Sequence, residues 1–347
     1  MIQNLPPHQT AGVSRRRFFG RMCELAAGTA AATWSHLLRW HAAEAAGASD
    51  FTGILPGFSE VSQAAESGAF KLRYVLASSL YGTLPLETVI AEVRKAGAEA
   101  IDIWPKHHAD HREQMESLGF EKVRSLLEKH EVKLAILSRY DLGPFHLKEE
   151  MRLLRDFGGE VIVTGSGGPR NLEGEALKSA VAQFVRQLEP HVDEAEDHRI
   201  CLAIENHSHS LICSEESILY FAEMAKSPNL GLALAPYHLP QDPKFLARLI
   251  ERLGPKLLHF YAWQYGRGCM EPLPREEQLE QMPGRGPLDF RPIMAALQKI
   301  NYSRYTEIFM HPVPRGVPIC ETAEKVTEEV NRAREYLERC LQEVEAT

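Results

Sequence analysis

The sequence predicts a (β/α)8 barrel preceded by an N-terminal signal segment. Strand-like and helix-like segments alternate eight times from residue 70 onward, and units of about 30 residues each are typical of this barrel. Polar residues gather where the strand-like segments end, which is where barrel enzymes carry their sites. The first strand-like segment ends in SSLYG. This turn lacks the glycine-rich phosphate motif of open doubly wound sheets, so we favour the barrel.

The expected strands are short apolar runs rich in β-branched residues, such as EVIVT, and such runs are typical of buried parallel strands. They are 71–79, 98–104, 133–140, 160–164, 199–209, 230–235, 256–263 and 304–312. The expected helices are amphipathic, and the first stops at Gly97 because glycine commonly follows a helix C-terminus. They are 86–96, 113–130, 148–157, 173–197, 215–226, 243–253, 288–300 and 322–343.

Composition limits the class of protein. The 347 residues are 44% hydrophobic and 25% charged, which is typical of an ordinary soluble protein with a substantial core. A formal net charge of -8 would repel a phosphate backbone on average, so we do not expect nucleic acid as a partner. The six cysteines lack CxxC spacing, which argues against both a disulfide framework and a zinc knuckle.

The N-terminus has the pattern of an export signal. Its SRRRFF motif, at residues 14–19, resembles the twin-arginine motif, and an alanine-rich run and the small residues Ala43-Glu44-Ala45 follow it. The run is too weakly apolar for a stable membrane span. We therefore predict a twin-arginine-type signal peptide at 1–46, a linker at 47–69, a barrel at 70–347 and a periplasmic location. The alternative is a basic amphipathic helix that stays on the protein.

Two strand-end glutamates are the strongest indication of chemistry. Glu205 lies toward the end of the segment RICLAIENHSH, and Glu307 lies in RYTEIFMHP. Each is followed in phase by a histidine, His207 and His311, because alternate residues of a strand share a face. Burying a carboxylate is costly unless a cation, a proton or a metal satisfies it. Each glutamate is therefore either functional or part of a structural ion pair with a basic residue.

The strand ends carry a resemblance. Strands five to eight end in AIENH, LALAPYH, LLHFYAWQYGR and YTEIFMHP, and PGRGPLDF precedes the last. These motifs resemble the xylose-isomerase-like TIM-barrel superfamily of sugar phosphate isomerases and epimerases, over residue 71 to the C-terminus. The resemblance implies a divalent metal, often manganese, held by Glu, Asp, His and Glu from strands five to eight. Glu205 and Glu307 match, but Ala235 replaces the aspartate and Tyr261 the histidine.

The resemblance also implies substrate contacts. His238 and Arg267 match substrate-binding positions of the sugar epimerases by spacing. Trp104, at the end of the second strand, is expected to stack on a sugar ring or to cap the barrel. If no metal binds, His238 and Arg267 would stabilise an oxyanion and Tyr261 would donate a proton. The loop KHHADH at 106–111 is expected to be a solvated polar loop rather than a metal site.

The expected function is therefore that of a sugar isomerase or epimerase. One glutamate would take a proton from carbon of a small sugar or keto sugar, and the other would act as an acid on the opposite face. A lyase acting on oxidised glycosides is a related alternative, and a non-catalytic sugar-binding barrel with a degenerate metal site is the second class. The endonuclease branch of the superfamily needs more His and Asp ligands and a basic groove, which the chain does not show. The sequence leaves homo-oligomerisation open.

Overall fold

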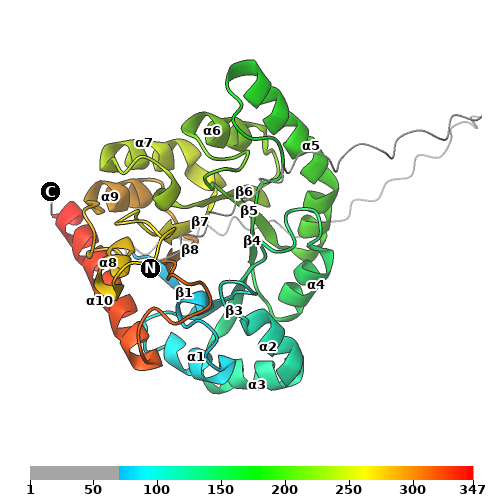
Figure 1. The fold of residues 1–347 in the computed structure, drawn as a ribbon. Coiled ribbons are helices and arrows are strands. Elements are labelled where there is room, and N and C mark those ends of the chain that lie inside the picture. Colours follow the sequence, from blue (N-terminus) through cyan, green and yellow to red (C-terminus); the bar gives the residue numbers. More distant parts are fainter. Residues whose placement is uncertain (1–69, 347) are drawn as a thin grey trace, which may run out of the picture. The chain divides into compact units, whose positions relative to one another are not determined.

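A computed structural model describes residues 70–346. Eight parallel strands form a closed barrel in the order β1 to β8, with β8 pairing with β1, and helices surround it (Figure 1). The predicted (β/α)8 barrel is confirmed. The signal predicted at 1–46 and the linker predicted at 47–69 lie outside the described residues.

The strands and helices follow the predicted order. The strands are β1 Arg73–Ala77, β2 Ala100–Ile103, β3 Lys133–Ser138, β4 Val161–Gly165, β5 Cys201–Glu205, β6 Leu230–Leu234, β7 Leu257–Ala262 and β8 Tyr305–Ile308. The helices are α1 Leu86–Val93, α2 His111–Leu118, α3 Phe120–Lys129, α4 Lys148–Asp156, α5 Gly174–His198, α6 Glu215–Met224, α7 Pro243–Leu253, α8 Arg275–Gln278, α9 Arg291–Lys299 and α10 Ala323–Glu345. Single 3-10 turns occupy Ser78–Leu80, Pro236–His238, Gly254–Lys256 and Leu279–Gln281.

The core lies inside the barrel and between the barrel and its helices. All five residues of β5 are buried, as expected for a strand that has side chains in the barrel on one face and helices on the other. Helix α7 buries Leu246, Leu249, Ile250 and Leu253, whose spacing places them on one stripe of the helix. Its C-terminus is at Gly254, which has a φ of 49°. Among the described helices, we find none that could cross a bilayer.

One predicted helix is divided. The segment 113–130 forms two helices, α2 and α3, separated by Gly119. Gly119 has a φ of 83°, a conformation that glycine adopts at little cost and that ends a right-handed helix. The amphipathic pattern continues through this residue, which is why the sequence alone suggested one helix.

Candidate active site

A cavity of about 790 Å³ lies at the carboxyl ends of the barrel strands. Residues from the strand ends and from the loops that follow them line it, as is usual for barrel enzymes. The lining residues are Trp104, His108, Tyr140, Gly165, Arg170, Glu205, His207, Ser208, His209, Ser210, Tyr237, His238, Leu239, Trp263, Tyr265, Cys269, Met270, His311 and Arg315. Its size falls in the upper part of the range of small-molecule sites, about 300–1,000 Å³.

Glu205 supplies the only carboxylate among these lining residues. It is the last residue of β5 and pairs in register with Gly165 of β4 and Ala233 of β6, so that small neighbours leave room above its side chain. Burial raises the pKa of Glu205 to about 8, although a hydrogen bond from Tyr140 opposes this effect. A carboxyl group with such a pKa, in a cavity, is a candidate for proton transfer.

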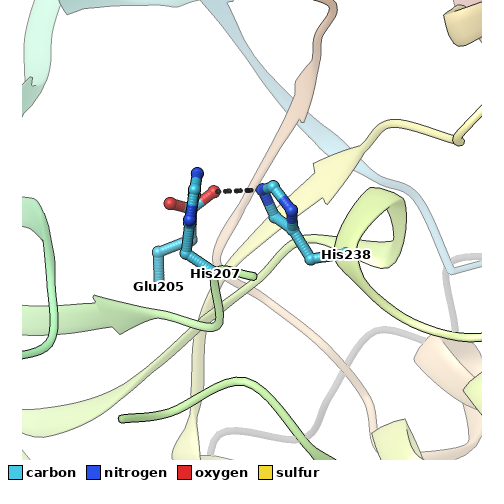
Figure 2. Close-up of side chains that lie close together, drawn as sticks. All are labelled: Glu205, His207 and His238. Carbon is cyan, nitrogen blue, oxygen red and sulfur yellow. Dashed lines mark ion pairs between the residues drawn. The ribbon is translucent and has the colours of Figure 1, made fainter. Parts of the chain in front are cut away.

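Two histidines point toward Glu205, as Figure 2 shows. His238 Nε2 lies 3.9 Å from Glu205 Oε1 and, within the described residues, has no hydrogen-bond partner although it is buried. Ser208 orients both rings: its carbonyl oxygen is 2.6 Å from His207 Nδ1 and its hydroxyl is 2.8 Å from His238 Nδ1. Both imidazoles therefore keep Nε2 for another partner.

These three residues fit a divalent metal ion. Glu205, His207 and His238 each offer one ligand atom, and these atoms lie within 4.8 Å of one another. A carboxylate and two imidazoles, each imidazole held by a hydrogen bond at its other nitrogen, are typical of catalytic metal centres. The set differs from the one that the resemblance implies, because Ala235 offers no ligand atom.

Glu307 does not reach the cavity. It lies within β8, is fully buried and is not among the lining residues, and His259 Nε2 is 2.9 Å from its Oε2. Asp102 and Trp104 are its other polar neighbours, but neither Glu307 oxygen accepts a hydrogen bond of good geometry within the described barrel. Burial raises the pKa values of Glu307 and Asp102 well above their usual range. The expected pair of carboxylates facing one cavity is not what the structure shows.

Some of the predicted site residues line the cavity and others do not. It brings Glu205, His238 and Trp104 to the cavity. Tyr261 is buried beside it, with its hydroxyl 3.1 Å from the Tyr140 hydroxyl. Arg267 is exposed on the loop after β7, 3.5 Å from Glu277, and does not line the cavity.

Aromatic rings form much of the cavity wall. The Trp104 ring stacks on Tyr140 at 5.4 Å, and Trp263 stacks on Tyr237 at 4.0 Å. Flat apolar faces of this kind bind the apolar face of a sugar ring and exclude water.

The sequence does not predict two groups of residues that line the cavity. His108, in the loop 106–111, is only partly exposed and stacks on His311 at 4.4 Å, whereas Lys106 and His107 are exposed as expected. Arg170 and Arg315 lie in the loops after β4 and β8. The sequence shows that both arginines follow strand ends, but it does not show which loop side chains turn into the cavity.

Comparisons with known proteins agree with this architecture. The family described as xylose isomerase-like TIM barrel matches residues 90–340. L-ribulose 3-epimerase has a similar structure (17% identity, TM-score 0.60, covering 80% of this chain and 96% of that one). D-psicose 3-epimerase with D-tagatose from Clostridium cellulolyticum H10 is also similar (14% identity, TM-score 0.60, covering 78% of this chain and 99% of that one). The IolI protein with a zinc atom is similar too (16% identity, TM-score 0.58, covering 79% of this chain and 99% of that one).

At these identities the solved structures show a shared fold. A comparison with curated proteins found no match. The family match spans most of the barrel. The chain therefore belongs to the xylose isomerase-like TIM barrel family.

Proposed function

We propose that the protein is a sugar isomerase that moves a proton between neighbouring carbons of a sugar or keto sugar. The observation that carries the proposal is the position of Glu205, a buried carboxyl group that faces an aromatic-walled cavity at the carboxyl ends of the strands. The sugar 3-epimerases with a similar structure act on substrates of this kind by name.

One carboxylate in the cavity favours isomerisation over epimerisation. Inverting a carbon centre needs an acid and a base on opposite faces of the substrate. Among the described residues Glu205 is the only acidic one that lines the cavity, whereas Glu307 is fully buried and does not line it. In an isomerisation, Glu205 takes the proton from one carbon and returns it to the next carbon on the same face, while the hydroxyl proton passes to the neighbouring carbonyl oxygen. A single base therefore suffices for the proton on carbon.

Glu205, His207 and His238 would hold a divalent metal ion, and we propose this set in place of the family's four ligands. A bound metal polarises the sugar oxygens and so stabilises the negative charge that develops when the carbon loses its proton. The chain itself contributes the rest: Ser208 orients the two imidazoles, and the rings of Trp104 and Trp263 position the sugar and exclude water.

Exchange of solvent hydrogen into sugars tests the proposal. Purified protein is incubated in deuterated buffer with a panel of aldoses, ketoses and keto sugars, with and without added zinc or manganese, and deuterium at carbon is followed by NMR. We expect exchange in at least one sugar and its loss in Glu205→Gln. Saturable sugar binding without exchange in any sugar would contradict the proposal and support a non-catalytic sugar-binding barrel, the alternative favoured by Ala235 and by the sealed Glu307.

A second alternative is a lyase that acts on oxidised glycosides. The cavity volume of about 790 Å³ favours it, because the site has room for a group attached to the sugar. The same proton transfer by Glu205 would then be followed by loss of that group from the neighbouring carbon. Product analysis with an oxidised (keto) glycoside added to the panel distinguishes the two, since a lyase releases an aglycone or a second sugar and an isomerase does not.

We also propose that residues 1–46 direct export by the twin-arginine pathway. The SRRRFF motif supports this proposal. Replacing Arg16 and Arg17 together by lysine is expected to keep the protein in the cytoplasm, as measured by cell fractionation. Normal export of the double variant would contradict it.

A further inference from the structure

Two guanidinium groups line the cavity without a carboxylate partner. We propose that the site binds a sugar carrying an anionic group, a carboxylate or a phosphate, and that Arg170 and Arg315 hold this group. The inference rests on the proposed function, since it names the substrate class of the same site. It starts from the absence, within residues 70–346, of any ion pair made by either arginine although both line the cavity.

Neutral groups hold Arg315 in place. Its Nη1 donates to the carbonyl oxygen of Pro312 at 2.6 Å, and its Nη2 donates to the carbonyl oxygen and the Sγ of Cys269 at 3.1 Å each. These bonds fix the guanidinium but leave its positive charge uncompensated. A fixed guanidinium with remaining donors suits a carboxylate or phosphate, which it can bind through two oxygens.

Arg170 also lines the cavity. It is exposed, in the loop after β4, and within the described residues it has no acidic partner. An anion bound in the cavity would therefore be attracted by both positive charges.

The rest of the cavity does not cancel these charges. Among the described lining residues Glu205 is the only acidic one, so the two arginines outnumber it. The cavity is thus positive in a chain whose formal net charge is -8. Elsewhere the buried arginines are paired: Arg112 and Arg139 both contact Glu150. A positive cavity in an acidic protein attracts anionic ligands and raises their local concentration.

Calorimetric titration of the full-length protein at low salt tests the inference with two matched pairs of probes. The first pair is glucuronate and its methyl ester, and the second is glucose 6-phosphate and glucose. We expect the anionic member of at least one pair to bind about tenfold more tightly than its neutral partner. The pair that shows the difference tells a carboxylate substrate from a phosphorylated one.

Variants connect the preference to the two arginines. Arg315→Gln and Arg170→Gln are each expected to weaken the anionic probe by about tenfold and to leave the neutral probe unchanged. Arg315→Lys keeps the charge and is expected to keep part of the preference, which distinguishes lost charge from a collapsed loop. Arg155→Gln, on the exposed side of α4, is the matched control and is expected to change neither probe.

Two results would overturn the inference: no preference for the anion in either pair, or an equal loss for both members of a pair in Arg315→Gln. Its failure can be told from failure of the proposed function, because the titration needs no turnover. If Glu205→Gln and the unaltered protein both prefer the anion but neither exchanges protons, the inference stands and the isomerase proposal does not.

Discussion

The two strand-end glutamates of this barrel lie in contrasting surroundings. Glu205 faces the cavity, next to His207 and His238. Glu307 is fully buried beside Asp102 and His259 and does not line the cavity. Similar sequence contexts therefore give one carboxyl group that can meet a substrate and one that cannot. The difference shows that access to the cavity, rather than the identity of the residue, decides which acid is available for chemistry.

The largest expected effect is that of replacing Glu205, the glutamate that faces the cavity. Glu205→Gln removes the carboxylate but keeps the size of the side chain, and we expect proton exchange to fall by roughly 10²- to 10⁴-fold, the usual contribution of a general base. Deuterium incorporation measured by NMR checks this. Sugar binding and thermal unfolding should change little, and exchange at an undiminished rate would remove Glu205 from the mechanism.

The next effect concerns the metal set. His238→Ala removes one of three ligand atoms, and we expect the affinity for zinc to fall by at least about 100-fold, more than the 10- to 100-fold typical of losing a group that only orients a ligand. Titration of metal-free protein with zinc measures it. His146→Ala, exposed and remote from the cavity, is the matched control. Equal zinc affinity in both variants would contradict the proposed set.

The buried Glu150 provides a comparison with Glu205 and Glu307. Glu150 is buried between Arg112 and Arg139; burial raises its pKa, but the hydrogen bond from Arg112 and the charge of Arg139 outweigh this and lower it overall. Glu150→Gln is expected to cost about 2 kcal/mol of unfolding free energy at neutral pH, the usual range for hydrogen bonds to a charged group. Because a lowered pKa stabilises the fold above the pKa of the unfolded state, the cost should shrink as the pH falls below about 4.

Urea unfolding at several pH values measures that cost. Glu149→Gln, on the same helix and exposed, is the control and should show little change. A cost that stays constant from neutral to acid pH would mean that the ionised form of Glu150 does not stabilise the fold.

Glu307→Gln should have the smallest effect on proton exchange, and its effect on stability should depend on pH in the opposite direction to that of Glu150→Gln. Burial raises the pKa of Glu307, so the folded state keeps a proton that the unfolded state loses above about pH 4. The unaltered protein therefore loses stability as the pH rises from there, by at most about 1.4 kcal/mol per pH unit. The variant lacks this loss, and its stability relative to the unaltered protein should improve as the pH rises.

Urea unfolding at about pH 5 and about pH 8 checks this slope. Proton exchange should change less than tenfold, far below the general-base contribution. An exchange rate in Glu307→Gln as low as that of Glu205→Gln would show that both acids act on the substrate. It would remove the contrast between the two glutamates.

The sequence predicted the barrel because each strand and helix carries its own local pattern. The run of β4 is apolar and β-branched, the run of β5 is apolar up to Glu205, and the stripe of α7 repeats with the period of a helix. The same patterns identified Glu205, which directly precedes a turn. They fix which face of a strand a residue occupies, but they do not fix how far along the barrel it lies.

This limit explains the contrast between Glu307 and His311. Both are in phase on the inner face of the last strand, but the chain continues upward past Phe309, so that His311 rather than Glu307 reaches the cavity. Long loops posed the other difficulty. Arg315 turns inward because carbonyl groups of Pro312 and Cys269 hold it, and Cys269 is 46 positions away in the chain. No local pattern records a contact of this kind.

Ser208 has a consequence for how this site can change during evolution. One residue, through its main chain and its hydroxyl, sets the angle of both imidazoles. A shift of that single turn tilts the two rings together, whereas Glu205 stays anchored in its strand. New substrates would therefore be accommodated by remodelling the loop after β5, with the barrel beneath it left as it is.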